Sequence, residues 1–131
     1  MKKIISFVAL GLVLSIGISA QEKTAWKEME DFHSVMGGTF HPAEEGNLQP
    51  IKKQSGEMLE KAIAWKSSDA PTGYNKKAIK SPLKKLVKGA RKIDKMVKIN
   101  ATDKELIAEL SGLHDIFHEI MEKKQLGDHD H

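Results

Sequence analysis

The sequence predicts an all-α protein, an antiparallel up-down-up-down four-helix bundle that follows an N-terminal signal peptide. After Ala20, apolar residues recur at alternating spacings of three and four, which is the period of a helix, and no stretch alternates with a period of two. The helical segments are joined mostly by short connections, which is typical of antiparallel bundles. The chain contains no cysteine, so an apolar core must hold the domain together without disulfides.

The N-terminal residues are expected to be a secretory signal peptide. Residues 1–3 form a short positive region, residues 4–18 are almost wholly apolar, and small residues precede a cleavage site at Ala20-Gln21. The apolar run is short for a membrane span, which needs about 20 residues. We therefore expect a periplasmic or secreted protein with no stable membrane insertion after cleavage, and no lipoprotein anchor because no cysteine follows the run.

Composition limits the function classes. The full chain carries a formal net charge of +3, and removal of Lys2 and Lys3 with the signal peptide lowers it to about +1, which gives little ground for a nucleic-acid partner. The lack of cysteine excludes thiolate zinc sites, iron–sulfur clusters and covalent haem attachment. The expected organisation is a signal peptide at 1–20, a bundle at 21–126 and a polar tail at 127–131.

The first helix is expected at residues 24–36. Gly37 and Gly38 should weaken it, and His41-Pro42 should end or redirect it, because the residue before proline disfavours the helical region. Its apolar stripe is Trp26, Met29, His33, Met36 and Phe40.

The second helix is expected at residues 48–65, before a loop at residues 67–73. Asn47 is a candidate N-cap, and Pro50 is tolerable because it falls in the first turn. The stripe of this helix is Leu48, Ile51, Ser55, Met58, Ala62 and Trp65.

The third helix is expected to open at Ser81-Pro82 and to stop near Asn100. Serine followed by proline is typical of an N-cap and the first helical position, and residues 74–80 favour only a short helical turn. The stripe of the third helix is Leu83, Leu86, Ala90, Ile93 and Val97.

The fourth helix is expected to open with a capping box formed by Thr102 and Glu105, and Gly127 should begin the polar tail. Its stripe is Leu106, Leu110, Leu113, Phe117 and Ile120.

Histidines are the candidate metal ligands, because neutral imidazole is the commonest protein metal ligand. His114 and His118 lie four residues apart, which places both on one helix face. His33 lies about 30° from the centre of the first stripe, which predicts a position inside the bundle, and His41 belongs to the outgoing loop. In an antiparallel bundle the first and last helices are neighbours, so these four imidazoles are predicted to converge on a zinc or copper ion.

Other residues are candidate secondary contributors. Glu45 is the preferred oxygen ligand or second-shell partner, Met36 offers a thioether, and Asp115 offers a further carboxylate. His129 and His131 would form a loose cation site in the tail. The alternative for each is an ordinary role, as core filler or as a solvated surface group.

The segments FHSVM, FHPAEEGNLQPIKKQSGEM and LHDIFHEI resemble a group of small exported bacterial proteins with FHxxM…HP and LHDxFH motifs. In architecture the chain also resembles the cytochrome b562 and cytochrome c′ bundles. The b562 resemblance implies haem ligation by Met29 or Met36 with His114 or His118. The c′ pattern fails because there is no CxxCH motif.

The sequence therefore predicts a periplasmic transition-metal-binding protein, for zinc or copper, that acts as a buffer, carrier or sensor. The alternatives are a b-type haem electron carrier and a metal-free helical interaction module whose protein partner the sequence does not identify. No serine–histidine elbow, phosphate-binding glycine loop or HExxH motif indicates an enzyme, although an open position on a bound metal leaves catalysis open.

Overall fold

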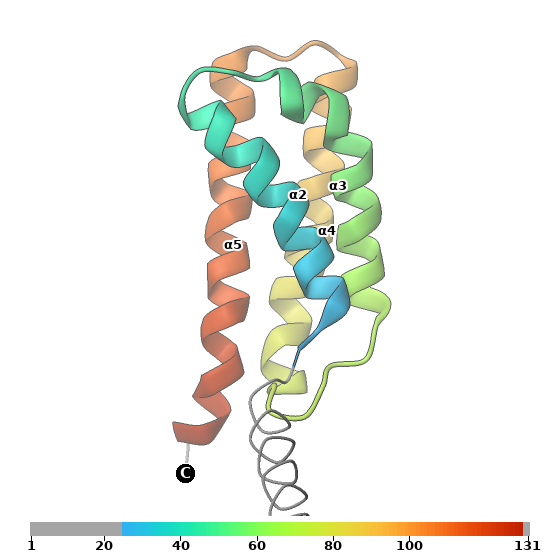
Figure 1. The fold of residues 1–131 in the computed structure, drawn as a ribbon, viewed down its shortest axis with the longest axis vertical. Coiled ribbons are helices and arrows are strands. Elements are labelled where there is room, and N and C mark those ends of the chain that lie inside the picture. Colours follow the sequence, from blue (N-terminus) through green and yellow to red (C-terminus); the bar gives the residue numbers. More distant parts are fainter. Residues whose placement is uncertain (1–24, 130–131) are drawn as a thin grey trace, which may run out of the picture.

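The structure is a computed structural model that describes residues 25–129, with side chains described as far as Lys123. The expected signal peptide at residues 1–20 lies outside the described part. Figure 1 shows four helices, and the described residues form no strand, so the all-α prediction is confirmed for them. Among these residues no helix is both long and apolar enough to cross a membrane. The helices are α2 (Lys27–Glu44), α3 (Gln49–Ser67), α4 (Lys76–Lys98) and α5 (Asp103–His129).

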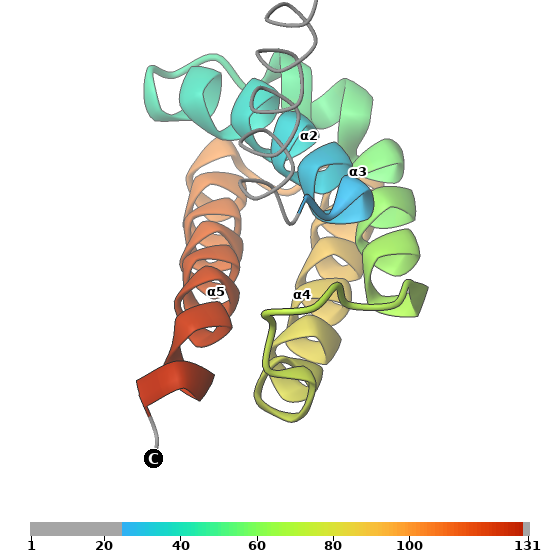
Figure 2. The same ribbon diagram turned by 60° about the horizontal axis from the view of Figure 1, so that its bottom comes forward.

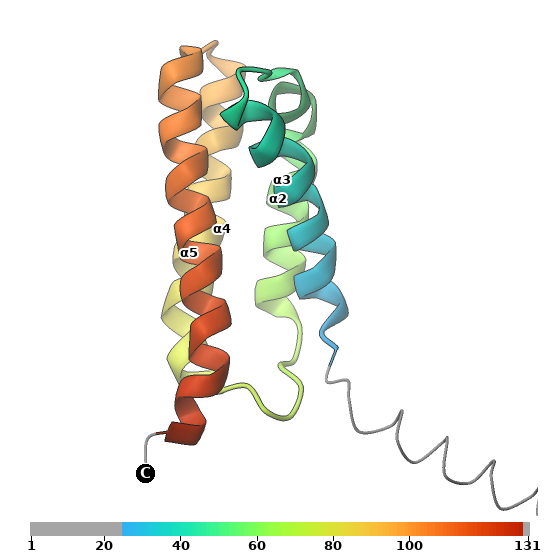
Figure 3. The ribbon, with the colours of Figure 1, turned by 60° about the vertical axis from the view of Figure 1, so that its left-hand side comes forward.

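The four helices pack against one another in chain order, and α5 also contacts α2. The contact between α2 and α5 is the least extensive of the four helix pairs. Figures 1 and 3 show that α2 and α5 lie close together near the C-terminal end of α2 and diverge toward the C-terminal end of α5. Figure 2, with the bottom of the bundle turned forward, shows the same separation. The edge between α2 and α5 is therefore the least closed side of the bundle.

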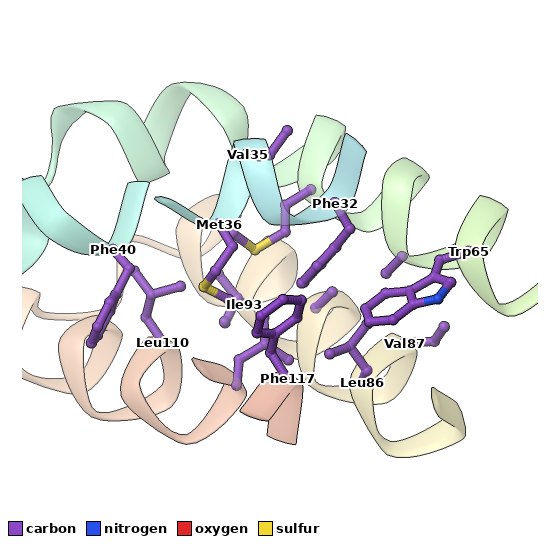
Figure 4. Packing of buried hydrophobic residues seen from close by; sticks show 14 of the residues in the cluster. Phe32, Val35, Met36, Phe40, Trp65, Leu86, Val87, Ile93, Leu110 and Phe117 are labelled. Atoms are coloured by element: carbon purple, nitrogen blue, oxygen red, sulfur yellow. The ribbon is translucent and has the colours of Figure 1, made fainter. Parts of the chain in front are cut away.

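The predicted apolar stripes form most of the core. Every predicted stripe residue of α3 and α5 is buried, and in α4 only Val97 is partly exposed. Figure 4 shows side chains of α2 meeting those of α5, with Phe40 beside Leu110 and with Phe32 and Met36 around Phe117. At one end of the core, the indole N–H of Trp26 donates a hydrogen bond to Ser68 Oγ at 2.8 Å. This bond ties the start of α2 to the end of α3.

Local capping confirms several predicted helix ends. The Thr102 N–H donates to Glu105 Oε1 and the Glu105 N–H donates to Thr102 Oγ1, both at 3.1 Å, so the predicted capping box is present. Asn47 Oδ1 accepts from the Gln49 N–H at 3.1 Å, although Leu48 is the N-cap residue of α3. Asn100 adopts φ 58°, a left-handed conformation that asparagine tolerates, and it follows the end of α4 as predicted.

The predicted end of the first helix is wrong. Helix α2 continues through Gly37 and Gly38 and past His41-Pro42 to Glu44. Its last turn buries Phe40 and Ala43 in the core, and this tertiary burial outweighs the low helix propensity of the glycines. Pro42 lies close to the C-terminus of the helix, so the disruption that a proline causes is confined to the last turn.

The predicted start of the third helix is also wrong. Helix α4 begins at Lys76, and Asn75 is its N-cap, with Oδ1 accepting from the Ala78 N–H at 3.0 Å. Pro82 therefore lies inside the helix, not at its first position. Because Ile79 and Pro82 are both buried, packing of this first part of α4 offsets the hydrogen bond that proline cannot make. At the other end of the chain, α5 continues beyond Gly127, where the polar tail was expected, to His129.

A buried carboxylate links α3 to α4. Asp94 Oδ1 accepts a hydrogen bond from Ser55 Oγ at 2.8 Å, and Asp94 Oδ2 lies 2.9 Å from Lys98 Nζ. The hydrogen bonds from Lys98 and Ser55 lower the pKa of Asp94 below its ordinary 3.8, although desolvation acts in the opposite direction. Both partners stabilise the ionised form, so folding favours the charged carboxylate.

This carboxylate predicts a pH-dependent loss of stability. A lowered pKa in the folded state contributes stability that is present above the unfolded pKa and is lost as the pH falls through the folded pKa. Asp94→Asn should therefore lower the free energy of unfolding at pH 7, and the difference from wild type should shrink below about pH 4. Urea unfolding followed by circular dichroism at both pH values measures it. A difference independent of pH would contradict the role of this ion pair.

Candidate functional site

Three of the candidate imidazoles follow a phenylalanine, in Phe32-His33, Phe40-His41 and Phe117-His118. All three phenylalanines are buried, and all three following histidines are exposed. Consecutive residues of a helix point about 100° apart, and in each pair the histidine falls on the side of its phenylalanine that faces away from the core. The rings consequently lie along the edge between α2 and α5 and not within the core.

The predicted position of His33 inside the bundle is wrong. Its side chain is exposed, and its ring stacks on Phe117 of α5, with ring centroids 4.7 Å apart and planes inclined by 19°. The buried face of α2 includes Phe32 and Val35, which lie on the side of the helix away from His33. His33 therefore covers the outer face of a core aromatic ring.

His114 and His118 form the closest imidazole pair. Their ring centroids lie 4.5 Å apart and their planes are nearly perpendicular, at 85°. His114 is partly buried and stacks on Phe40 of α2, with centroids 4.2 Å apart. His118 is exposed and lies beside Phe117, with centroids 5.8 Å apart. The phenylalanine of one helix thus fixes the position of a histidine on the other.

His41 lies at the same end of the α2–α5 edge as this pair. Its Nδ1 is 3.6 Å from Glu44 Oε1, one turn later in α2. Charges on His41 and Glu44 both affect the pKa of His114, which places the last turn of α2 close to that imidazole. Glu45, the carboxylate preferred from the sequence, is the exposed C-cap residue of α2 and has no ion pair within the described residues.

Burial lowers the pKa of His114 below its ordinary 6.5. Repulsion from a protonated His118 lowers that pKa further, while the carboxylates of Asp115 and Glu44 act in the opposite direction. The lowered pKa favours the neutral form of His114 at pH 7. A neutral imidazole has a free lone pair, so no proton must be displaced before a cation binds.

The remaining candidates lie apart from this pair. Met36 is buried in the core, with 1% of its surface exposed, and Asp115 is exposed on α5. The His129 side chain and all of His131 lie outside the part of the chain whose side chains are described.

The four predicted ligands do not form one preassembled metal site. Within the described residues, no group of three or more histidine, aspartate and glutamate side chains is arranged to hold a metal ion. The pair formed by His114 and His118 remains a possible two-nitrogen chelate. This arrangement differs from a closed structural zinc site, which requires four protein ligands.

A groove of about 590 Å³ runs along the same edge, where α2 and α5 diverge. It lies within the size range of pockets for small molecules and cofactors, roughly 300–1,000 Å³. Two imidazoles, two thioethers and one phenyl ring line it, together with two polar side chains: His33, His118, Met29, Met121, Phe117, Glu30 and Ser34. A planar apolar ligand with a metal at its centre suits these donors.

Sequence reasoning preferred Glu45 to Glu44 as the carboxylate beside His41, and it missed Met121 as a wall of the groove. The signal for Glu44 was its spacing of three residues from His41 within one helix, but the helix was expected to end before Pro42. The sequence around Met121 does not indicate a place in the groove wall, because only the divergence of α2 and α5 exposes this side chain to the groove.

Comparison of the chain with protein-family models, with curated proteins and with solved structures finds no match.

The environment of His114 predicts the titration of the imidazole pair. In an NMR titration of the histidine ring protons, His114 should titrate below 6.5 in the wild-type protein. In His118→Ala the His114 pKa should rise, because a positive neighbour is removed, but should stay below 6.5 because burial against Phe40 persists. A His114 pKa above 6.5 in the wild-type protein would contradict this packing.

Proposed function

We propose that the protein binds a transition-metal ion, copper or zinc, in an exchangeable two-imidazole site formed by His114 and His118. The observation that carries the proposal is the separation of their ring centroids, 4.5 Å, on one face of α5. Waters would complete the coordination, and the neighbouring charge of Glu44 would favour a bound cation. A site with few protein ligands and open access suits a metal buffer or carrier.

The separation of the two rings favours right-angled coordination. With metal–nitrogen bonds of about 2.0–2.1 Å, the ion lies about 3.2 Å from each ring centre, so rings bound at 90° lie about 4.5 Å apart and rings at the tetrahedral angle about 5.2 Å apart. The 4.5 Å separation of the ring centroids equals the right-angled value, which suits copper(II). The terminal torsion of histidine is broad, so both rings can turn toward a shared ion.

The proposal includes export of the chain. A positive N-terminus, an apolar run and small residues at Ala20 support a cleaved signal peptide and a periplasmic or secreted location. The short connections between successive packed helices support the up-down-up-down topology. In this setting a cysteine-free protein would contribute imidazole nitrogens, and no thiolates, to a bound metal.

Calorimetric titration with copper(II) and zinc tests the metal proposal. The protein should carry His129→Ala and His131→Ala, so that the tail contributes no binding. His114→Ala and His118→Ala should each weaken copper binding by at least about tenfold, since even residues behind metal ligands typically contribute that much. Copper(II) should bind more tightly than zinc, because copper(II) has the higher affinity of the two at most nitrogen sites.

His33→Ala is the matched control for this titration. It also removes an exposed imidazole from the α2–α5 edge, one that stacks on Phe117 and is not part of the proposed pair. It should leave copper affinity unchanged. An equal loss in all three variants would contradict the two-residue assignment, and no stoichiometric binding in the parent protein would rule out the function.

The groove between α2 and α5 favours a second candidate, a b-type haem. His118 of α5 and His33 or Met29 of α2 line the groove and are the residue types that ligate haem iron. Phe117 and Met121 would cover the macrocycle and exclude water. When bound, the haem would supply one-electron redox chemistry, as in the b562 bundles that the sequence resembles.

Titration with ferric haem, followed by the Soret band, separates the two candidates. If haem is the ligand, His33→Ala should weaken haem binding and His114→Ala should not. If only a bare ion binds, His114→Ala should weaken copper binding, and no Soret shift should appear in any protein. Because His118 belongs to both sites, its alanine variant serves as the shared positive control.

A further inference from the structure

The outward face of α4 carries most of the positive charge of the chain. Ten of the 21 basic residues but only one of the 18 acidic residues lie in α4, so this helix has a formal charge of +9 and the rest of the chain −6. All ten basic side chains are exposed. The overall charge of +3 conceals this separation.

The charge forms a continuous stripe. Five of these residues share the face of α4 opposite the core: Lys77, Lys84, Lys88, Arg91 and Lys95. They are separated by seven, four, three and four residues, which are spacings that repeat on one side of a helix. At a rise of about 1.5 Å per residue, the stripe from Lys77 to Lys95 extends for about 27 Å along α4. Of the ten basic residues of α4, only Lys92 and Lys98 have a carboxylate of another described residue within ion-pair distance, Glu109 and Asp94 respectively. Like charges one turn apart repel, so an anionic surface docked along this face would relieve that repulsion.

Apolar groups accompany the stripe. Ile99, 74% exposed, is the C-cap residue of α4 and lies four residues after Lys95, at the end of the stripe. Ile63 of α3, 39% exposed, lines a groove with Lys84, Lys88 and Arg91. They are the large hydrophobic residues that the described part of the chain exposes.

Together these features select one partner chemistry. Lysine outnumbers arginine nine to one in α4, whereas protein interfaces are enriched in arginine and depleted of lysine. Nucleic-acid binding rests mainly on phosphate contacts and gives the exposed isoleucines no role. Binding to an anionic bilayer accounts for both the lysines and the exposed isoleucines, because lysines lie at the headgroups while apolar side chains enter the acyl boundary.

We propose that the basic face of α4 docks the folded protein peripherally on a bilayer that contains anionic phospholipid. The stripe binds the phosphate headgroups, and Ile99 and Ile63 contact the acyl region. The α2–α5 edge belongs to other helices, so this surface does not depend on the metal or haem proposals.

Co-sedimentation of the chain from Gln21 onward with lipid vesicles tests the proposal. The protein should bind vesicles of mixed phosphatidylglycerol and phosphatidylcholine, should not bind vesicles of phosphatidylcholine alone, and should bind less as salt rises. Lys84→Glu with Lys88→Glu should weaken binding more than about twenty-five-fold, because each basic residue near an anionic surface contributes roughly a factor of five and the introduced carboxylates add repulsion. Ile99→Ser should weaken binding while leaving its salt dependence intact.

Lys53→Glu with Lys104→Glu is the matched control. It makes the same change in net charge at exposed positions of α3 and α5 and should retain most of the binding. Circular dichroism confirms that each variant is folded. Equal weakening by the control would show that net charge alone acts, and it would overturn the assignment to α4. Absence of binding to anionic vesicles, or equally tight binding to poly-glutamate or duplex DNA, would overturn the choice of a lipid partner.

Discussion

Burial of the phenylalanines in three Phe-His pairs decides where the imidazoles lie. Phe32, Phe40 and Phe117 enter the core, and the following histidine in each pair is therefore turned to the rim. Two of these rings also serve as stacking partners across the edge, Phe117 for His33 and Phe40 for His114. The same packing that closes the bundle thus spaces the imidazoles along a line and keeps them from meeting at one point. This constraint favours a small chelate or an elongated ligand over a closed four-histidine site.

The sequence predicted the features that depend on local pattern, but not those that depend on tertiary packing. The stripes of α3 and α5 and the capping box at Thr102 and Glu105 follow from periodicity and from short-range hydrogen bonds. The helix end predicted at Pro42 and the helix start predicted at Pro82 were wrong, because burial of the residues around each proline outweighs its local cost to the helix. His33 was misplaced because the predicted stripe left out four residues that are buried in α2, namely Phe32, Val35, Thr39 and Ala43. With them included, the centre of the buried face lies about 80° from His33 on the helical wheel.

Two surfaces of different character lie on different helices of one small bundle. The α2–α5 edge presents imidazoles, thioethers and aromatic rings, and α4 presents a nearly uninterrupted row of cations. The lysines that repel one another and the incomplete closure between α2 and α5 are both unfavourable for an isolated folded chain. Each is explained if the protein works in contact with something else, a cation or cofactor at one surface and an anionic layer at the other.

The central claim is that only His114 and His118 share an ion. X-ray absorption spectroscopy of the copper-loaded protein, with His129 and His131 replaced by alanine, tests it most directly, because scattering from imidazole rings reports how many of them coordinate. The account predicts two imidazoles, with oxygen atoms in the remaining positions. A fit that required three or four imidazoles, or a sulfur ligand from a methionine, would contradict it.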